Sequence, residues 1–413
     1  MNEILIRTNK GEYNPGEEIY GVVYLNIINP TAGRGVRLSF LGYEHFVYEY
    51  TDEEEKDKDG NKYEARKDYM KTSATLFEKE DPLMLGSYMI PFRLKLLSEL
   101  PGTFHASNHD TVMKVRWAAT ACYSVEAEVI DSKNMKTQQE INVVQFASQN
   151  TLPLAFRAEH TVTSFLFHRR SFKVDAVSQC LVIYQIPPNF TSTKLPPQAV
   201  SVAHRVTWLL FAKKELHVTS RLKDHWCRSG GTAKLRIIIT NDTHVNVTGI
   251  SIKLIRELMF MCKIGSQRRP RVDKCLVDEI DGRVLIHPEG ERVTLGQQSI
   301  LNSHTEVFNR GLDNILIPLK DGNMRPVIPS VKGSHILCQY SLEVQVNLSN
   351  GATVPLTVPL PAVLPCENPE WQKWQAPDWV SEAEVTSTEG LLSVPSNVLY
   401  SEAFSGIPGF QQL

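Results

Sequence analysis

The stretch YNPGEEIYGVVYLNI (13–27) contains the turn and strand from which the fold of the chain is predicted. Its proline presets φ and its glycine tolerates positive φ, so we predict a structural turn formed by Pro15, Gly16 and Glu17. The residues that follow alternate, which places Ile19, Val23, Leu25 and Ile27 on one face of a strand. A tight turn that leads into a strand with one buried face is typical of all-β proteins.

The same alternation recurs along the chain. Val36, Leu38 and Phe40 alternate with polar residues, and the clearest case is the stretch 340–348, in which Tyr340, Leu342, Val344, Val346 and Leu348 alternate with polar side chains. A second glycine turn, at 228–231, leads into Leu235, Ile237 and Ile239. The second half therefore restarts like the first, and the spacing of turns favours β-sandwiches or β-barrels.

The length and the charge of the chain limit the number of domains and the classes of function that it can have. The chain has 413 residues, which allows two or three domains. Apolar residues make up 42% of it, enough to build packed cores. Its 44 lysines and arginines nearly balance 46 aspartates and glutamates, for a formal net charge of −2. A chain without an overall positive field is a weak candidate for binding nucleic acid.

The sequence also points to a compartment. The first residues, MNEILIR (1–7), lack the basic stretch and apolar core of a secretory signal, and the long uncharged run at 344–366 holds four prolines that disfavour a membrane helix. The seven cysteines are an odd number without a Cys-x-x-Cys pair. We therefore expect a cytosolic protein with reduced cysteines and no membrane span.

Three segments interrupt the strand pattern. Thr51–Asp68 is so charged that we expect a solvated loop, with a partner-probing loop as the sharper alternative. The proline-rich stretch 151–214 is predicted to bridge two domains, and extra strands or another domain border within it are left open. From residue 366 the alternation ends, and Trp371, Trp374 and Trp379 lie in a flexible tail that either covers a sheet edge or binds a partner.

Motifs of catalysis are missing from the sequence. It has no Gly-x-Ser-x-Gly elbow, no phosphate loop, no Gly-x-Gly-x-x-Gly and no His-Glu-x-x-His. We therefore expect a protein that is not an enzyme and has no catalytic residue, metal site or cofactor. An enzyme whose site is assembled from distant loops stays open as an alternative.

Small basic clusters are the remaining chemical signal. Arginine suits bidentate capture of phosphate and lysine acts as a point charge, so such clusters could bind an acidic or phosphorylated tail. Solvated surface charge is the simpler interpretation of each. The candidate partner-binding residues are Arg7, Lys10, Arg169, Arg170, Lys213 and Lys214.

Five fragments in order resemble one known family. YNPGEEIYGVVYLNI (13–27), GVRLSFLGYEHF (35–46) and LPGTFHASN (100–108) resemble the arrestin N-terminal domain, in which a Pro-Gly-Glu turn opens a strand and a Leu-Pro-x-x-Phe stretch precedes a long strand. The segments 227–258 and 328–364 resemble the glycine-strand-Asn-strand unit and the closing hairpin of the arrestin C-terminal domain. The most similar branch is the α-arrestins, also called arrestin-domain-containing proteins.

This resemblance implies two tandem immunoglobulin-like β-sandwiches, at 1–150 and 215–365, followed by the tail at 366–413. It also implies a cytoplasmic adaptor, peripheral to the plasma membrane and endosomes, that binds cytosolic tails of membrane proteins and recruits sorting or ubiquitin-ligase machinery. Carried over by position, Arg7 and Lys10 lie on the first strand, where receptor-binding arrestins place basic residues for phosphates.

The chain departs from the α-arrestin pattern in its tail. It has no Pro-Pro-x-Tyr motif, since Pro187-Pro188-Asn189-Phe190 ends in phenylalanine, so recruitment of a ubiquitin ligase would have to be indirect. A structural subunit of an endosomal sorting coat, like the arrestin-like subunit of retromer, is the alternative within the same fold.

Overall fold

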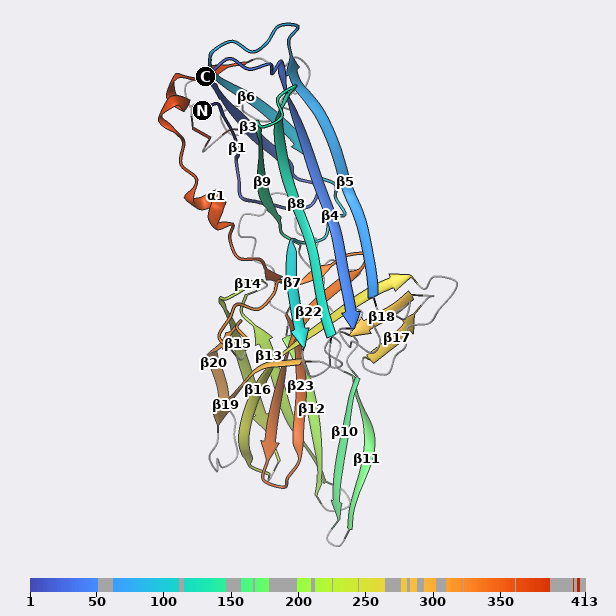
Figure 1. Cartoon of the computed structure of the whole chain (residues 1–413). Helices are drawn as coiled ribbons and strands as arrows, with labels where there is room; N and C mark the ends of the chain where they lie inside the picture. The colour runs from blue at the N-terminus through green and yellow to red at the C-terminus, as the bar shows by residue number, and fades with distance from the viewer. Residues whose placement is uncertain are drawn as a thin grey trace.

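The computed structural model describes residues 1–50, 62–110, 115–145, 157–165, 168–177, 199–208, 212–224, 226–243, 245–263, 276–280, 283–287, 293–301, 310–321, 323–360, 362–386, 404, 407 and 408. The chain is built almost entirely of strands, arranged as two β-sandwiches that lie end to end (Figure 1). The predicted all-β tandem sandwich is therefore confirmed.

Two sheets form the first sandwich. The smaller sheet has the order β1 (Glu3–Thr8), β3 (Glu18–Ile27), β6 (Gly86–Lys95) and β25 (Glu384–Val385). The larger has the order β2 (Glu12–Tyr13), β9 (Lys136–Val143), β8 (Val115–Ile130), β4 (Gly35–Tyr50) and β5 (Lys62–Glu78), with β7 (Phe104–Asp110) also paired to β8.

Two further sheets form the second sandwich. One has the order β11 (His168–Val177), β10 (Arg157–Phe165), β12 (Ala199–Trp208), β13 (Ala212–Leu222), β15 (Thr232–Asn241) and β20 (Arg310–Pro318). The other has the order β17 (Leu276–Ile280), β18 (Arg283–His287), β16 (Val247–Lys263), β22 (Ile336–Leu348) and β21 (Val331–Lys332), with β19 (Val293–Leu301) on β16 and β23 (Thr353–Leu360) on β22. A short parallel pair, β14 (Cys227–Arg228) and β24 (Val363–Leu364), completes it.

Alternation in the sequence becomes burial in the structure. In β4 the side chains of Val36, Leu38 and Phe40 are buried, while that of Arg37 is exposed. In β22 the residues from Tyr340 to Leu348 follow the predicted pattern, with the apolar positions at most 3% exposed. A one-residue slip would exchange the two faces, so the register of these strands is strongly specified.

The stretch between the two predicted sandwiches contains three strands. β10, β11 and β12 extend the sheet of β13, β15 and β20, and β12 pairs with β13 along its whole length, from Ala199↔Arg221 to Trp208↔Ala212. The predicted bridge therefore contains extra strands, which had been left open, and these strands pair with the sheet of the second sandwich.

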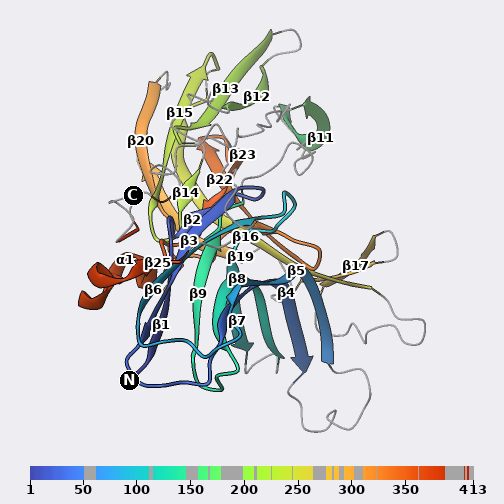
Figure 2. The same ribbon diagram turned by 90° about the horizontal axis from the view of Figure 1, so that it is seen from above.

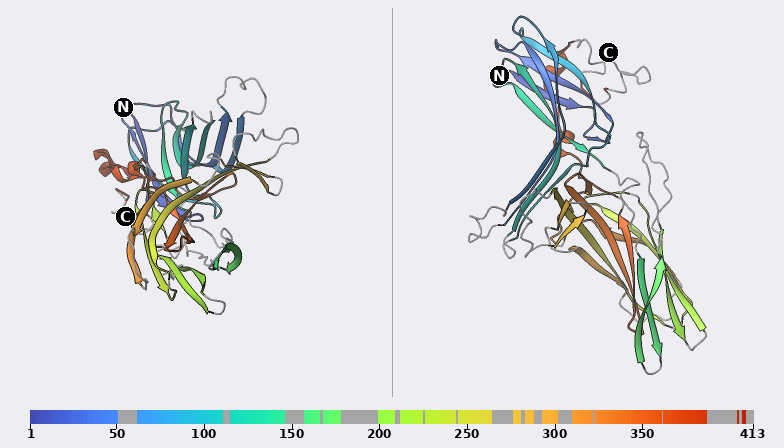
Figure 3. Two further views of the ribbon diagram at one scale, coloured as in Figure 1. Left: turned by 90° about the horizontal axis from the view of Figure 1, so that it is seen from below. Right: turned by 90° about the vertical axis from the view of Figure 1, so that its right-hand side faces the viewer.

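The far ends of β4, β7 and β8 pack into the apolar core of the second sandwich, while the first sandwich has a separate core around Phe40 and Tyr123. The long strands β4 and β8 run past the first sandwich and reach the second (Figure 1; Figure 3, right). Their far ends bring Phe46 and Trp117 against Phe260 of β16, at ring-centroid distances of 5.0 and 5.3 Å. All three side chains are at most 4% exposed. Burial of aromatic rings at this junction joins the sandwiches by the same apolar packing that holds each one together.

A buried carboxylate crosses the junction. Glu44 of β4 is 0% exposed and accepts hydrogen bonds from the backbone N–H groups of Ser334, His335 and Ile336, at 2.8, 2.9 and 2.7 Å. The hydroxyl of Tyr69 adds a fourth, at 2.7 Å. Removal of this carboxylate would leave buried donors unpaired, so it holds the start of β22 against β4.

One boundary predicted from charge was wrong. Lys62–Asp68 is part of β5 rather than a loop, and residues 51–61 of the predicted loop lie outside the described residues. β5 is an edge strand, and its charged side chains pair locally: His45 with Glu64 and Arg66 with Asp68, each at 2.9 Å. Charged residues are the common protection of an exposed sheet edge.

Candidate functional site

The outer face of β1, β3 and β6 is the most unusual surface of the first sandwich, because it is apolar. β3 buries Ile19, Val23, Leu25 and Ile27 inside the sandwich, yet Tyr20, Val22 and Tyr24 on its other face are also at most 6% exposed. A strand that is apolar on both faces is normally covered on both sides. Here the outer face of β3 is covered by residues that follow position 365.

Residues 366–386 run along this face (Figures 1 and 2). They form the short helix α1 (Pro369–Lys373), the 3-10 helix η3 (Asp378–Glu382) and β25. The Asn368 side chain caps α1 by accepting hydrogen bonds from the N–H groups of Glu370 and Trp371, as expected for asparagine before a helix with proline at its first position. The described part of the tail is therefore packed against the sheet, in agreement with the alternative in which the tail covers a sheet edge.

Tryptophan side chains make the contact. Trp374 stacks on Tyr24 at 5.8 Å between ring centroids, and Trp371 Nε1 donates to the carbonyl of Thr8 at 3.1 Å. Trp379 Nε1 donates to Glu3 Oε2 at 2.9 Å. The three half-buried indoles thus pack on the sheet, and those of Trp371 and Trp379 also donate hydrogen bonds to it. Tryptophan in this way contributes both apolar contact area and a fixed orientation.

The end of the segment reaches the sheet edge. β25 pairs in parallel with β6, through Glu384↔Tyr88 and Val385↔Met89. Further along the chain, the ring of Phe404 meets Tyr20 edge-on at 5.6 Å, and the Tyr24 hydroxyl donates to the carbonyl of Pro408 at 2.7 Å. Both the face and the open edge of this sheet are therefore occupied.

Arg7 lies beneath the tryptophans. Its guanidinium is 3.9 Å from the centroid of Trp371 and 5.1 Å from that of Trp374, and Nη1 donates to the carbonyl of Trp371. The residue is 8% exposed, and desolvation lowers the pKa of its guanidinium, which still remains charged at neutral pH. Its Nε is buried and has no partner among the described residues. A covered cation with an unused donor is suited to binding an anion once the cover is removed.

Lys10 is placed differently. Its ammonium pairs with Glu17 of the turn, and the side chain is 55% exposed. The turn itself has Gly16 at φ +81°, and the Glu17 N–H donates to the carbonyl of Asn14 at 3.1 Å. Arg7 lies on the first strand as predicted, but Lys10 does not, because β1 ends at Thr8. Arg7 is covered, whereas Lys10 is paired with Glu17 at the surface.

The other predicted cations lie in the second sandwich. Arg169 and Arg170 are on β11, in the hairpin with β10, and Lys213 and Lys214 are on β13 opposite Thr207 and Val206. Figure 1 shows β10 and β11 at the end of the molecule away from the N-terminus. The structure therefore does not bring the six predicted residues together, and Arg7 alone lies in the covered face.

Among the described residues, no cluster of three or more histidine, cysteine, aspartate or glutamate side chains is arranged to hold a metal ion. No helix in this part of the chain is long and apolar enough to cross a membrane.

Comparisons with known proteins agree with the architecture. Residues 3–150 match the family model of the arrestin (or S-antigen) N-terminal domain, and residues 212–369 match that of the arrestin (or S-antigen) C-terminal domain. A segment of 136 residues is 25% identical to Arrestin domain-containing protein A of Dictyostelium discoideum. That segment is 31% of this chain and spans only 23% of the relative. With both domains matched in order over most of its length, the chain belongs to the arrestin family.

Proposed function

We propose that this protein is a non-enzymatic adaptor that binds cytosolic tails of membrane proteins during endocytic sorting, through the outer face of β1, β3 and β6. The observation that carries the proposal is the occupation of that face by an extended segment of the chain itself, with Arg7 beneath Trp371 and Trp374. A face that holds one peptide segment in this way is shaped to hold another.

The contacts match known modes of peptide recognition. β25 adds a strand to the edge of β6, so main-chain hydrogen bonds supply part of the affinity. The rings of Tyr20 and Tyr24 supply apolar contact area, and Arg7 supplies one charge. A cargo tail with an aromatic residue and an acidic or phosphorylated residue would satisfy both groups, and it would compete with residues 366–386.

The cellular setting follows from this role. Such an adaptor would act in the cytoplasm, at the plasma membrane and endosomes, and would recruit sorting machinery. Because the sequence has no Pro-Pro-x-Tyr motif, a ubiquitin ligase would join through another protein.

The test weakens the intramolecular contact while leaving the sandwich intact. Trp371→Ala combined with Trp374→Ala should increase binding of the full chain to immobilised cytosolic tails of membrane proteins, measured by pull-down with and without phosphorylation. Adding Arg7→Gln should abolish the gain. Arg37→Gln is the matched control, since Arg37 is an exposed arginine of the same sandwich, paired with Glu128 at 3.1 Å. Equal binding by the wild type and all variants would refute the proposal.

Affinity purification separates the adaptor from the coat subunit. An adaptor should recover membrane proteins in substoichiometric amounts, and the double tryptophan variant should recover more. A constant one-to-one complex with other coat proteins, unchanged by the tryptophan substitutions, would favour the coat subunit instead.

A further inference from the structure

Residues 368–371, Asn-Pro-Glu-Trp, lie where the tail meets β1 and β9, on the outside of the first sandwich (Figure 1). They form a turn in which Asn368 Oδ1 accepts hydrogen bonds from the backbone N–H groups of Glu370 and Trp371, at 3.0 and 3.2 Å. Pro369 occupies the first helical position, to which its fixed φ is already suited. The first two residues therefore shape the turn through local interactions.

The Asn368 side chain also fastens the turn to the sheet. Its Nδ2 donates to the carbonyl of Glu140 in β9 at 3.0 Å, so one amide uses its oxygen on the turn and its nitrogen on the sheet. Aspartate caps a helix as well as asparagine does, but it has no donor and would place a carboxylate oxygen against that carbonyl. This position therefore distinguishes asparagine from aspartate.

The Trp371 ring lies in an aromatic seat, which we define as Arg7, Thr8 and Gly11. The Arg7 guanidinium is 3.9 Å from the centroid of the ring, and the Thr8 carbonyl accepts from the indole N–H at 3.1 Å. A Cβ added at Gly11 would lie only 3.0 Å from the ring. A cation over the ring face favours tryptophan, tyrosine or phenylalanine, and the glycine leaves room for a flat side chain. The seat is therefore suited to an aromatic residue.

The two middle residues of the turn make a different contribution. Pro369 and Glu370 are both exposed, so the contacts with the sheet come from the first and fourth residues. The chain has two other Asn-Pro pairs, at 14–15 and 29–30, and neither has an aromatic residue two positions after the proline. The combination of a capped turn and a ring at its fourth position is thus specific to the segment that occupies this face.

We propose, on the basis of the function proposed above, that the membrane-protein tails bound by this face carry the pattern Asn-Pro-x-aromatic, in which x is any residue. Residues 368–371 then occupy the face in place of such a tail. The pattern follows from what is seated there: an amide that donates to Glu140, a proline that shapes the turn, and a ring between Arg7 and Gly11. Because residues 368–371 belong to the same chain, their effective concentration is high, and a partner must compete with them.

Fluorescence anisotropy with short labelled peptides tests the pattern. The protein is the opened chain, which is the full chain carrying Trp371→Ala and Trp374→Ala, and the parent peptide contains Asn-Pro-Glu-Tyr. Alanine in place of the tyrosine should weaken binding about thirtyfold or more, because the buried ring and its cation–π contact are lost. Aspartate in place of the asparagine should weaken it about threefold to tenfold. Alanine in place of the proline should weaken it about twofold to fivefold.

Gly11→Val in the opened chain blocks the seat and leaves the charge of Arg7 in place. It should weaken binding of the parent peptide about tenfold or more. Arg37→Gln in the opened chain is the control and should bind like the opened chain itself. The peptide series leaves the protein unchanged, so it stays decisive if Gly11→Val does not fold. Equal affinities for the asparagine and aspartate peptides, or unchanged binding by a folded Gly11→Val variant, would overturn the pattern.

Pull-down separates the pattern from the broader function. The opened chain is offered two immobilised cytosolic tails that differ only in the pattern, one with Asn-Pro-x-Tyr and one with Asp-Ala-x-Ala. Capture of the first alone supports both the pattern and the adaptor. Equal capture of both overturns the pattern and leaves the adaptor standing, whereas capture of neither overturns both.

Sedimentation of the wild type checks the other possible occupant, the tail of a second copy. We expect a monomer, because the tail of the same chain already fills the seat. Dimers that disappear on Trp371→Ala would assign the face to a second copy and would overturn the pattern as a property of partner tails.

Discussion

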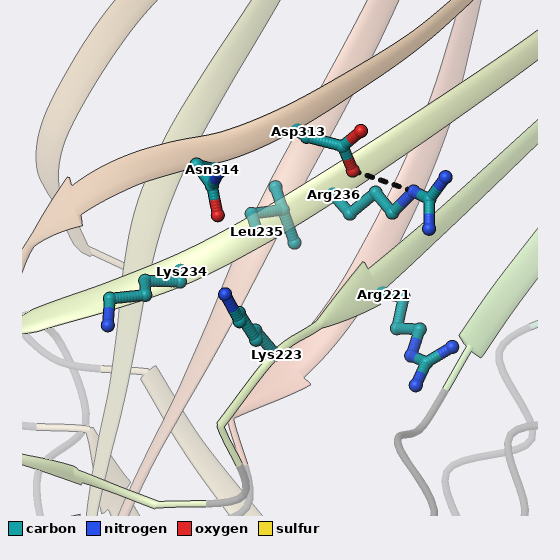
Figure 4. A pocket seen from close by; sticks show the side chains of 7 residues that line it. All are labelled: Arg221, Lys223, Lys234, Leu235, Arg236, Asp313 and Asn314. Atoms are coloured by element: carbon teal, nitrogen blue, oxygen red, sulfur yellow. Dashed lines mark ion pairs between the residues drawn. The ribbon is translucent and has the colours of Figure 1, made fainter.

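The outer faces of the two sandwiches differ in polarity and in whether other residues cover them. On the first, Tyr20, Tyr24 and Val22 are apolar and lie under the tail, with one arginine enclosed among tryptophans. On the second, the face of β13, β15 and β20 is exposed and carries four cations with one acidic partner (Figure 4). One face is thus covered by a segment of the same chain, while the other is open to solvent. The difference shows that an apolar sheet face needs a cover, whereas a charged one does not.

The largest effect should come from the covered face. Tyr24→Ala removes a ring that is 0% exposed, together with its stacking on Trp374 and its hydrogen bond to Pro408. We expect a loss of about 3 to 5 kcal/mol in the unfolding free energy of the first sandwich. Chemical denaturation measures this loss of unfolding free energy. Hydrogen exchange should rise in residues 369–386, because their contact with Tyr24 is lost. Ile238→Ala on the exposed face, where Ile238 is 37% exposed, should change stability by less than about 0.5 kcal/mol. Equal effects of the two substitutions would remove the distinction between the faces.

Arg7 tests what the enclosed charge contributes. Arg7→Gln loses two cation–π contacts and the hydrogen bond to Trp371, and should lower stability by about 1 to 2 kcal/mol. Hydrogen exchange of the tail amides should be faster in the same variant. Arg37→Gln, which breaks an exposed ion pair, should cost less than about 1 kcal/mol and leave the tail unchanged. A tail that stays protected in the Arg7 variant would show that the arginine does not help to hold it.

A substitution of Arg221 on the exposed face should change stability in the opposite direction. Arg221→Gln removes one of two arginines that face each other, so stability should stay level or rise by up to about 1 kcal/mol. Chemical denaturation at low ionic strength, where repulsion is least screened, is the sensitive measurement. A loss of stability there would mean that Arg221 has an attractive partner in the fold.

The smallest effect is a pH dependence at the rim of the covered face. Burial raises the pKa of Glu18, but hydrogen bonds from Arg93 and Tyr20 outweigh it and lower the pKa below its ordinary value. The carboxylate therefore stabilises the fold above its unfolded pKa of about 4.3, and this contribution is lost as the pH falls through the lower folded pKa. The unfolding free energies of the wild type and Glu18→Gln should differ by less than about 1 kcal/mol at pH 7, and the difference should shrink as the pH falls below about 4.3. A difference that grows on acidification would contradict this sign.

Local pattern predicted much of the fold. The alternation in 36–40 and 340–348 and the turn chemistry at 14–17 led to the correct class, because each strand has one buried face and its register follows from that face. The position of the tail was harder to predict from the sequence. Three tryptophans in a polar segment indicate a docking sequence. The apolar side chains of Tyr20, Val22 and Tyr24 on the second face of β3 are the matching signal for a covered face.

Closeness in sequence is a poor guide to which cations meet in the structure. Lys213 and Lys214 are adjacent in the chain, where they lie on β13 opposite Thr207 and Val206. Arg221 and Arg236 are distant in the chain and face each other only because β13 and β15 pair in the observed register. Arg7 looked like an exposed phosphate ligand for the same reason, since residues more than 360 positions away cover it.

The sequence alone therefore determined the strands and the turns, because alternation and turn chemistry depend on residues a few positions apart. The tandem β-sandwich followed from the resemblance of five fragments to the arrestin domains. Only the tertiary structure decided the packing around Phe260, the enclosure of Arg7 and the facing cations, because each needs residues from distant segments to meet. Burial and charge at those places are properties of the assembled sheets, and no local pattern carries them.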